Sequence, residues 1–146
     1  MAGTPTVAEC AGLLYLCRTL DGVPMVGAVD ADAAMAPRLT LAYRRSTAGA
    51  DSVLATAGTE VTGHEFHRTA VNPPAGAARS RAGVPSTGGP GAAPAWTSSA
   101  GPEGFVSGSV HASYLHTHWA GHPAMAARFA AHARRFATAR RPARLG

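Results

Sequence analysis

The chain has 146 residues, about the length of one domain, and a formal net charge of +5 at pH 7. Its hydrophobic fraction of 46% excludes a fully disordered protein and is typical of a globular one. No apolar run approaches the roughly 18 residues of a membrane span, and no secretory leader precedes the two cysteines. We therefore expect a cytoplasmic protein with no membrane partner, in which Cys10 and Cys17 are reduced thiols.

The first half of the chain is predicted to hold a strand, a helix and further strands. Residues 5–9 form the first strand, and residues 11–21 follow as a helix with apolar side chains three and four positions apart. Residues 25–29 are a short apolar run suited to a buried strand. Residues 39–43 alternate in the two-residue period of a strand, and residues 59–71 are predicted to be extended.

The second half begins with a segment rich in proline and glycine. Residues 73–104 carry few large apolar side chains, so they cannot offset their ordering entropy and are predicted to be a long mobile loop. Residues 105–110 are predicted as a strand. The loop after them contains four histidines: His111, His116, His118 and His122. Residues 123–139 are predicted as a closing helix, because Pro123 suits a first helical position.

Cys10 lies where the first strand meets the first helix. Its neighbours two positions away, Ala8 and Gly12, are small, as the tight strand-to-helix turn of a nucleophile elbow requires. A helix N-terminus favours a thiolate, and the amide of Ala11 would face a developing oxyanion. These residues alone are equally compatible with a buried structural cysteine. Cys17 falls on the apolar helix face and is predicted to belong to the core.

Four blocks of the sequence, in the same order, resemble cobyrinate and hydrogenobyrinate a,c-diamide synthases. They are residues 7–16 (VAECAGLLYL), 35–41 (MAPRLTL), 63–67 (GHEFH) and 112–118 (ASYLHTH). The resemblance implies an α/β fold, namely a partial class I glutamine amidotransferase domain of flavodoxin-like type, truncated at its N-terminus. The family often has an aromatic residue after the third block, where this chain has Arg68.

The resemblance also implies a reaction. In this family a cysteine attacks the side-chain amide of glutamine, ammonia is released, and a thioester is hydrolysed. A separate synthetase domain uses ATP and Mg²⁺ to activate carboxylates of a corrin, cobyrinate or hydrogenobyrinate, in vitamin B12 synthesis. Because this chain has no P-loop, we expect it to be the glutaminase portion, with no cofactor of its own. A cobyric acid synthase type of enzyme is the alternative, and the complete enzyme is expected to form a homodimer.

The residues of the predicted site follow from the same resemblance. Cys10 is the nucleophile, His116 the base, and Ala11 the oxyanion-hole residue, and no metal ligand is assigned. Related amidotransferases often carry an orienting acid two positions after the base, where this chain has His118. A Cys–His pair oriented by a backbone carbonyl is therefore expected. Three further residues are candidates for binding substrate or orienting the base: Glu65, His67 and His118.

The predicted organisation has four parts. Residues 1–72 carry the nucleophile elbow, residues 73–104 are the flexible loop, residues 105–139 carry the catalytic histidine and the closing helix, and residues 140–146 are a basic tail. A central parallel strand needs neighbours on both sides, and the chain supplies none before its first strand. We therefore expect the chain alone to be weakly stable and inactive.

Two rival classes of function fit single features of the sequence. A histidine-rich metal protein would suit the spacings of His64 with His67 and of His116 with His118, although no Cys-x-x-Cys or His-Glu-x-x-His motif accompanies them. A nucleic-acid binder would suit the C-terminal arginines. Because the tail lacks aromatic residues beyond Phe136 and fits no known module, we expect no nucleic-acid partner.

Overall fold

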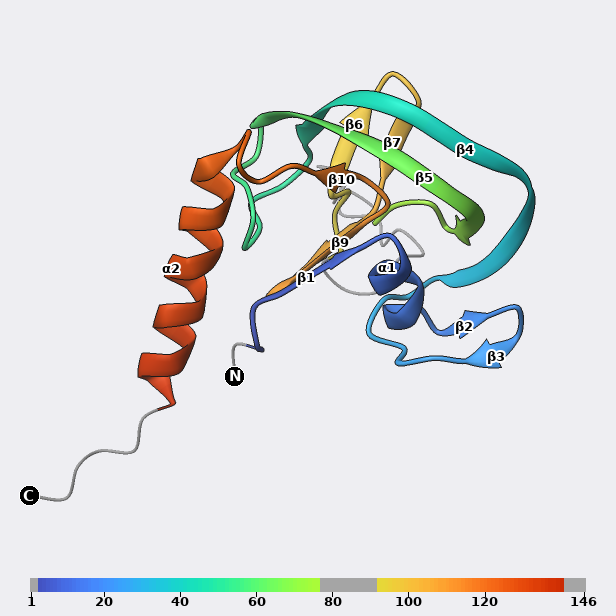
Figure 1. Ribbon diagram of the computed structural model, residues 1–146. Coiled ribbons are helices and arrows are strands. Elements are labelled where there is room, and N and C mark those ends of the chain that lie inside the picture. The colour runs from blue at the N-terminus through green and yellow to red at the C-terminus, as the bar shows by residue number, and fades with distance from the viewer. Residues whose placement is uncertain (1–2, 77–91, 141–146) are drawn as a thin grey trace, which may run out of the picture.

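The computed structural model describes residues 3–76 and 92–140, which form an α/β fold with two sheets (Figure 1). A three-stranded sheet of order β1-β9-β8 comprises β1 (Thr6–Glu9), β8 (Phe105–Ser107) and β9 (Val110–Ser113). The other sheet is built on two long strands, β4 (Asp32–Ala48) and β5 (Glu60–Asn72). The remaining elements are β2 (Thr19–Leu20), β3 (Val23–Pro24), β6 (Trp96–Ser98), β7 (Gly101–Glu103), β10 (His116–Thr117), α1 (Ala11–Leu16) and α2 (Pro123–Ala139).

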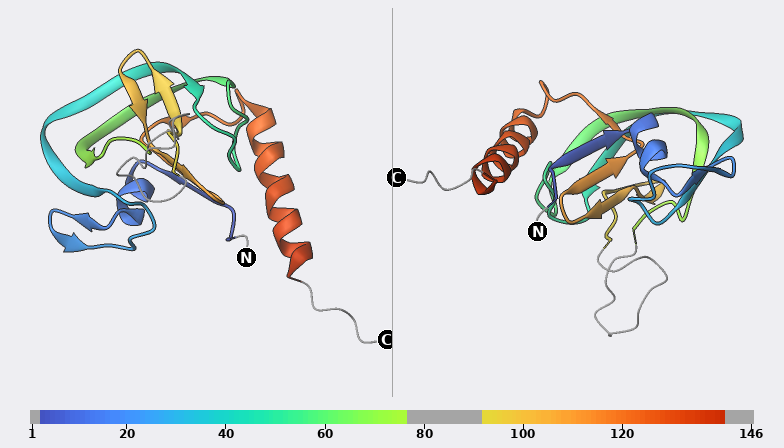
Figure 2. Two further views of the ribbon diagram at one scale, coloured as in Figure 1. Left: turned by 180° about the vertical axis from the view of Figure 1, so that it is seen from behind. Right: turned by 90° about the horizontal axis from the view of Figure 1, so that it is seen from below.

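The antiparallel β4–β5 pair arches over the rest of the molecule (Figures 1 and 2). The strand predicted at 39–43 lies within β4, and the extended segment predicted at 59–71 is confirmed as β5, which begins and ends one residue later. The pairing register shifts between Met35 and Thr40. Pro37 lies inside this interval and cannot donate a ladder hydrogen bond, so the irregularity falls where the sequence already interrupts the ladder.

Helix α1 is shorter than the predicted helix 11–21. Cys17 follows its last residue and is extended, with ψ of 169°. The next amide, that of Arg18, donates to the carbonyl of Ala31 at 2.8 Å, and β2 then pairs in parallel with the start of β4. Sheet pairing therefore outweighs the helical periodicity that continues beyond Cys17.

The apolar run at 25–29, predicted as a buried strand, is a loop that caps α1. Its amides donate to carbonyls at the end of the helix: Val26 to Tyr15, Gly27 to Cys17, and Val29 to Leu16. The last carbonyls of a helix have no partner within it, so this loop satisfies groups that a strand would leave unpaired.

Residues 92–104, predicted as the end of a mobile loop, contain β6 and β7. Trp96 in β6 is 1% exposed, and its ring packs edge-on against that of His111 with centroids 5.1 Å apart. Burial of a large side chain of this kind stabilises a fold by about 1.5–3 kcal/mol, which anchors a segment otherwise poor in apolar groups. The rest of the predicted loop, residues 77–91, and most of the predicted basic tail, residues 141–146, lie outside the described residues.

The predicted strand 105–110 is in fact part of a hairpin of β8 and β9 that turns at Gly108, where φ is 56°. His111, predicted to lie in a loop, is a buried residue of β9. Its Nδ1 lies 3.0 Å from Oγ of Ser52, and its Nε2 has no hydrogen-bond partner among the described residues. Burial lowers the pKa of His111 to about 4, so the core holds a neutral imidazole.

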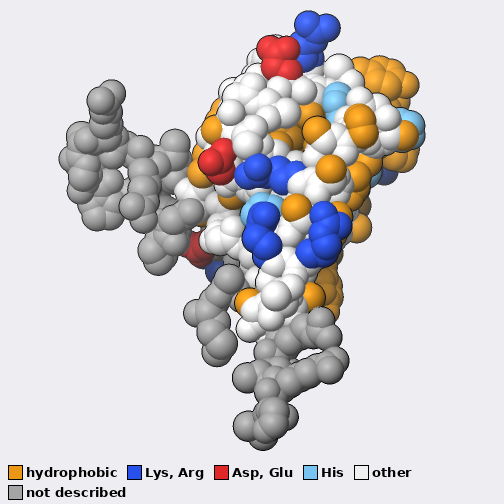
Figure 3. All heavy atoms as spheres, turned by 90° about the vertical axis from the view of Figure 1, so that its left-hand side faces the viewer, with side chains coloured by type: hydrophobic (Ala, Val, Ile, Leu, Met, Phe, Trp, Pro, Cys, Tyr) orange, Lys and Arg blue, Asp and Glu red, His pale blue; other side chains and the backbone are white. Residues whose placement is uncertain are grey.

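Helix α2 confirms the predicted bounds 123–139, with Pro123 at its start. Met125 is buried, and Phe129 meets Trp119 edge-on with ring centroids 5.9 Å apart. The remainder of the helix projects away from the sheets (Figure 2). Figure 3 views this side of the molecule and shows arginine side chains over it. Arg128 of α2 donates from Nε to the carbonyl of Ser52 at 2.7 Å.

Neutral His111 predicts a loss of stability in acid. The unfolded chain binds a proton near the ordinary pKa of 6.5, but folded His111 binds it only near pH 4. Its contribution to stability is therefore complete above pH 6.5 and is lost as the pH falls to 4, by on the order of 3 kcal/mol.

Thermal unfolding between about pH 7 and pH 5 measures this effect. The melting temperature of the wild type should fall further than that of His111→Asn, which keeps a polar partner for Ser52 but does not titrate. Other titrating groups are shared by both proteins and cancel in the comparison. If the melting temperature falls equally with pH in both proteins, His111 is not the acid-sensitive group.

Candidate active site

Cys10 forms a strained turn between β1 and α1. Its φ of 53° and ψ of −108° lie in a region that residues other than glycine rarely adopt. A Cβ atom on Gly12 would lie 3.3 Å from that of Ala8, so the small residues on either side of Cys10 meet across the turn. The Cys10 amide donates to the carbonyl of Ser113 at 2.8 Å. The tight strand-to-helix turn therefore holds Cys10 against the end of β9.

Cys10 and His116 meet the same edge of β5. Sγ of Cys10 lies 3.8 Å from the carbonyl oxygen of Phe66, and Nδ1 of His116 lies 3.2 Å from that of His64. The rings of His116 and His64 also stack, with centroids 4.8 Å apart. Carbonyls of alternate residues point to the same edge of a strand and are about 7 Å apart. Two neighbouring carbonyls of β5 thus place the thiol and the imidazole next to each other.

The contact with the carbonyl of His64 determines which nitrogen of His116 donates a hydrogen bond and which can accept a proton. A neutral imidazole that donates from Nδ1 to a carbonyl leaves Nε2 as a proton acceptor. Cys10 is half-buried, whereas Cys17 is fully buried and donates to the carbonyl of Leu13 at 3.3 Å. Burial raises the pKa of Cys17 to about 11, so Cys17 is a core thiol.

Gly63 allows β10 to approach this edge. A Cβ atom at Gly63 would collide with the carbonyl oxygen of His116 and would lie 3.0 Å from the side chain of Leu115. Any larger residue would push His116 away from its partner His64. The glycine of the GHEFH block is therefore explained by the close approach of two backbones.

Ala11 lies next to Cys10, whereas His118 lies beyond β10. Ala11 is the first residue of α1, so its amide has no partner within the helix and adjoins Cys10. His118 is exposed in the turn after β10, where its carbonyl accepts from the amide of Gly121 at 2.9 Å. His116, and not His118, is thus the histidine that β10 carries to β5.

Glu65 and His67 lie on the opposite face of β5 from His64, as strand alternation predicts. The carboxylate of Glu65 binds Nε of Arg44 at 3.0 Å and lies 3.4 Å from Nε2 of His67. The hydrogen bond from His67 and the pairing with Arg44 lower the pKa of Glu65 against the opposing effect of burial. His67 also stacks on Tyr114 with ring centroids 3.7 Å apart. Both predicted residues thus bond to or stack on other residues at the inner face of the β4–β5 hairpin. In the described chain neither is bonded to His116.

Two carboxylates that were not among the predicted site residues hold the segment around His116. Glu103, at the end of β7, accepts from Oγ of Ser113 at 2.6 Å and from the amide of Tyr114 at 3.0 Å, and burial raises its pKa to about 7. Glu9 accepts from Oγ1 of Thr117 at 3.0 Å. The position of Glu9 beside the elbow could have indicated it. Glu103 lies in the segment that was predicted to be a loop, so no pattern pointed to it.

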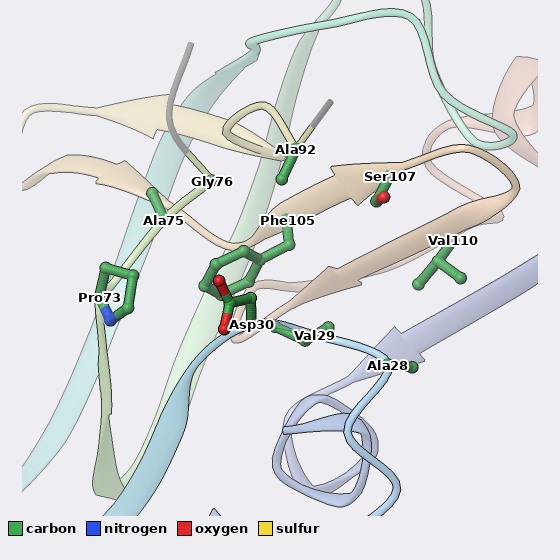
Figure 4. A pocket seen from close by; sticks show the side chains of 10 residues that line it. All are labelled: Ala28, Val29, Asp30, Pro73, Ala75, Gly76, Ala92, Phe105, Ser107 and Val110. Carbon is green, nitrogen blue, oxygen red and sulfur yellow. The ribbon is translucent and has the colours of Figure 1, made fainter. Parts of the chain in front are cut away.

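Two cavities lie apart from the Cys10 thiol, which lines neither of them in the described structure. A cavity of about 410 Å³ has Arg38, Glu65 and Glu103 in its wall. A second cavity of about 180 Å³ lies beside β8, with Phe105 and Asp30 facing it (Figure 4). Across residues 3–76 and 92–140, no three His, Cys, Asp or Glu side chains are grouped to hold a metal ion. In the same part of the chain, neither helix has the length and apolar character needed to cross a membrane.

Comparison with known proteins identifies related sequences. The hydrogenobyrinate a,c-diamide synthase of Streptomyces coelicolor is 56% identical over 131 residues, which are 88% of this chain and 24% of that protein. The protein of the same name from Thermobifida fusca is 51% identical over 137 residues, 89% of this chain and 26% of the relative. The cobyrinate a,c-diamide synthase of Gloeobacter violaceus is 39% identical over 132 residues, 86% of this chain and 25% of the relative. No solved structure matches the chain.

The chain thus spans about a quarter of the length of these relatives. The sequence profile of CobB/CobQ-like glutamine amidotransferase domains matches residues 1–124. The match includes the elbow at Cys10, the GHEFH block and His116. With most of its length covered, the chain belongs to the family of CobB/CobQ-like glutamine amidotransferase domains.

Proposed function

We propose that this chain is the glutaminase portion of a hydrogenobyrinate a,c-diamide synthase, which supplies ammonia for the amidation of a corrin. The main support is the placement of the Cys10 thiol and the His116 ring on neighbouring carbonyls of β5. Identity favours hydrogenobyrinate as the corrin, because the relatives named for it are 56% and 51% identical and the relative named for cobyrinate is 39% identical. We place the reaction in the cytoplasm, where both thiols stay reduced.

In the proposed reaction, Nε2 of His116 takes the proton of the Cys10 thiol as Sγ bonds to the amide carbon of glutamine. The oxygen of that amide becomes an oxyanion, which the amide of Ala11 stabilises. The carbon–nitrogen bond then breaks, and the proton held by His116 leaves with the nitrogen as ammonia. Water, deprotonated by His116, hydrolyses the thioester to glutamate and restores the thiol.

The outer face of the β4–β5 hairpin supports a protein partner. Three large apolar side chains on it are more than half exposed: Leu41, Tyr43 and Phe66, of which Leu41 and Phe66 lie opposite each other in the ladder. Exposed apolar surface of this kind marks interaction sites. Tyr43 pairs across the strands with His64, which in turn stacks on His116, so this face extends to the candidate site. We propose that an ATP- and Mg²⁺-dependent synthetase part contacts this face, because the ammonia must pass to it from Cys10.

A chimera tests the proposed function. This chain would replace the matching quarter of the Streptomyces coelicolor relative, and amidation of hydrogenobyrinate would be measured with glutamine or with ammonium as nitrogen source. The chimera should use both sources, and its Cys10→Ala variant should use ammonium alone, because external ammonia bypasses the glutaminase step. Unchanged glutamine use in Cys10→Ala would rule out Cys10 as the nucleophile.

Selective labelling tests Cys10 in the same chimera. A glutamine-analogue alkylator should modify Cys10 and leave Cys17 unmodified, because burial raises the pKa of Cys17 to about 11 and shields it. Mass spectrometry of peptides would locate the label, and labelling after denaturation, which exposes both thiols, provides the control. Preferential labelling of Cys17 would contradict the assignment.

The two neighbouring histidines offer a matched pair of variants. In the chimera, His116→Asn should lower kcat for glutamine hydrolysis by about 10²–10⁴-fold, the usual contribution of general acid–base catalysis. His118→Asn should change kcat by less than about threefold, because His118 is exposed and lies in the turn beyond β10. A larger loss in His118→Asn than in His116→Asn would reverse the two roles.

A further inference from the structure

The segment between β9 and β10 carries His116 and is bound by a carboxylate at each end. At its start, Glu103 accepts from Oγ of Ser113 at 2.6 Å and from the amide of Tyr114 at 3.0 Å. At its end, Glu9 accepts from Oγ1 of Thr117 at 3.0 Å and from the amide of Thr117 at 3.4 Å. His116 lies between these anchors and reaches the carbonyl of His64.

Ser113 connects Glu103 to both members of the candidate pair. Its hydroxyl donates to Glu103 and accepts from the amide of Leu115 at 2.8 Å, so it fixes the turn immediately before His116. Its carbonyl accepts from the amide of Cys10 at 2.8 Å. Ser113 is 1% exposed, so water does not compete for these bonds. A shift of Ser113 would therefore move Cys10 relative to His116.

Glu103 reaches this point from a different part of the fold. It is the last residue of β7, which pairs with β6, and β6 pairs with the end of β4. A carboxyl group suits the position because its two oxygens each accept one donor, the hydroxyl of Ser113 and the amide of Tyr114. The contacts around Ser113 are thus set by a hairpin that forms no hydrogen bond with Cys10 or His116 within the described structure.

We propose that Glu103 is a positioning residue that sets the geometry between Cys10 and His116 by holding Ser113 and Tyr114. This inference rests on the proposed roles of Cys10 and His116. Glu103 acts through Ser113 and does not contact the reacting atoms. Its effect should therefore appear as a change in how His116 activates Cys10.

Four variants separate this role from a general effect on folding. Glu103→Ala removes both acceptors. Glu103→Gln keeps an acceptor for the Tyr114 amide and a donor for Oγ of Ser113, so it imitates a protonated carboxyl group. Ser113→Ala removes the connection but leaves Glu103 in place. Glu60→Ala, at an exposed glutamate of β5, is the matched control.

The measurement is the rate at which iodoacetamide alkylates Cys10 of the full chain, from about pH 5 to pH 9. His116→Asn serves as the reference variant. Thermal unfolding confirms that each variant folds. At pH 7, His116→Asn should react at least about tenfold more slowly than the wild type, because the thiol has lost its base. Glu103→Ala and Ser113→Ala should approach the pH–rate profile of His116→Asn. The alkylation rates of Glu103→Gln and Glu60→Ala should stay within about threefold of the wild-type rate. A double variant that combines Glu103→Ala with Ser113→Ala should react no more slowly than the slower of the two single variants, because both changes break the same connection.

Two results would overturn the inference in distinguishable ways. A folded Glu103→Ala with the wild-type profile, beside a slow His116→Asn, would remove the role of Glu103 and leave the proposed function intact. A His116→Asn as fast as the wild type would remove the proposed base and the inference with it. If Glu103→Ala does not fold, a wild-type rate in folded Ser113→Ala is the result that overturns the inference.

Discussion

Parallel pairing of β1 with β9 is the constraint on which the candidate site depends. The register aligns Glu9 with Ser113, so two strands that are far apart in the sequence end at the same level. The bond from the Cys10 amide to the Ser113 carbonyl extends this pairing to the elbow. A slip of one residue would turn every side chain of β1 to the opposite face and would take Cys10 away from β5. The local strain at Cys10 is useful only because this register directs its thiol to the edge where His116 lies.

The features that local residues impose were predictable from the sequence. The elbow needs small residues around Cys10, and Pro123 marks the start of α2, whose bounds the structure reproduces. Alternation along β5 correctly placed Glu65 and His64 on opposite faces. The expectation that a carbonyl, and not an acid, faces His116 followed from the histidine at position 118, and the fold supplies that carbonyl from His64.

The features that depend on distant partners were not predictable in the same way. Helix α1 stops where β2 begins to pair with β4, and the apolar run after it is drawn into capping the helix. Trp96 orders β6 in a segment whose composition alone indicates a loop. His111 lies in β9 against Ser52, a residue from another part of the chain. Glu103 takes its place from the pairing of β7 with β6, which no short motif encodes.

The candidate site also differs from a triad in how its imidazole is held. Glu9, Glu65 and Glu103 all lie near the segment of His116, yet in the described structure each is bonded to other donors. A carboxylate beside His116 would stabilise the imidazolium by charge, whereas a carbonyl fixes the tautomer and contributes only a dipole. With less charge to stabilise the ion pair, the proposed reaction would depend more on the relative placement of Cys10 and His116. That dependence fits the contacts that restrain His116: the ladder to His64, the clearance at Gly63, and the carboxylates on either side of its segment.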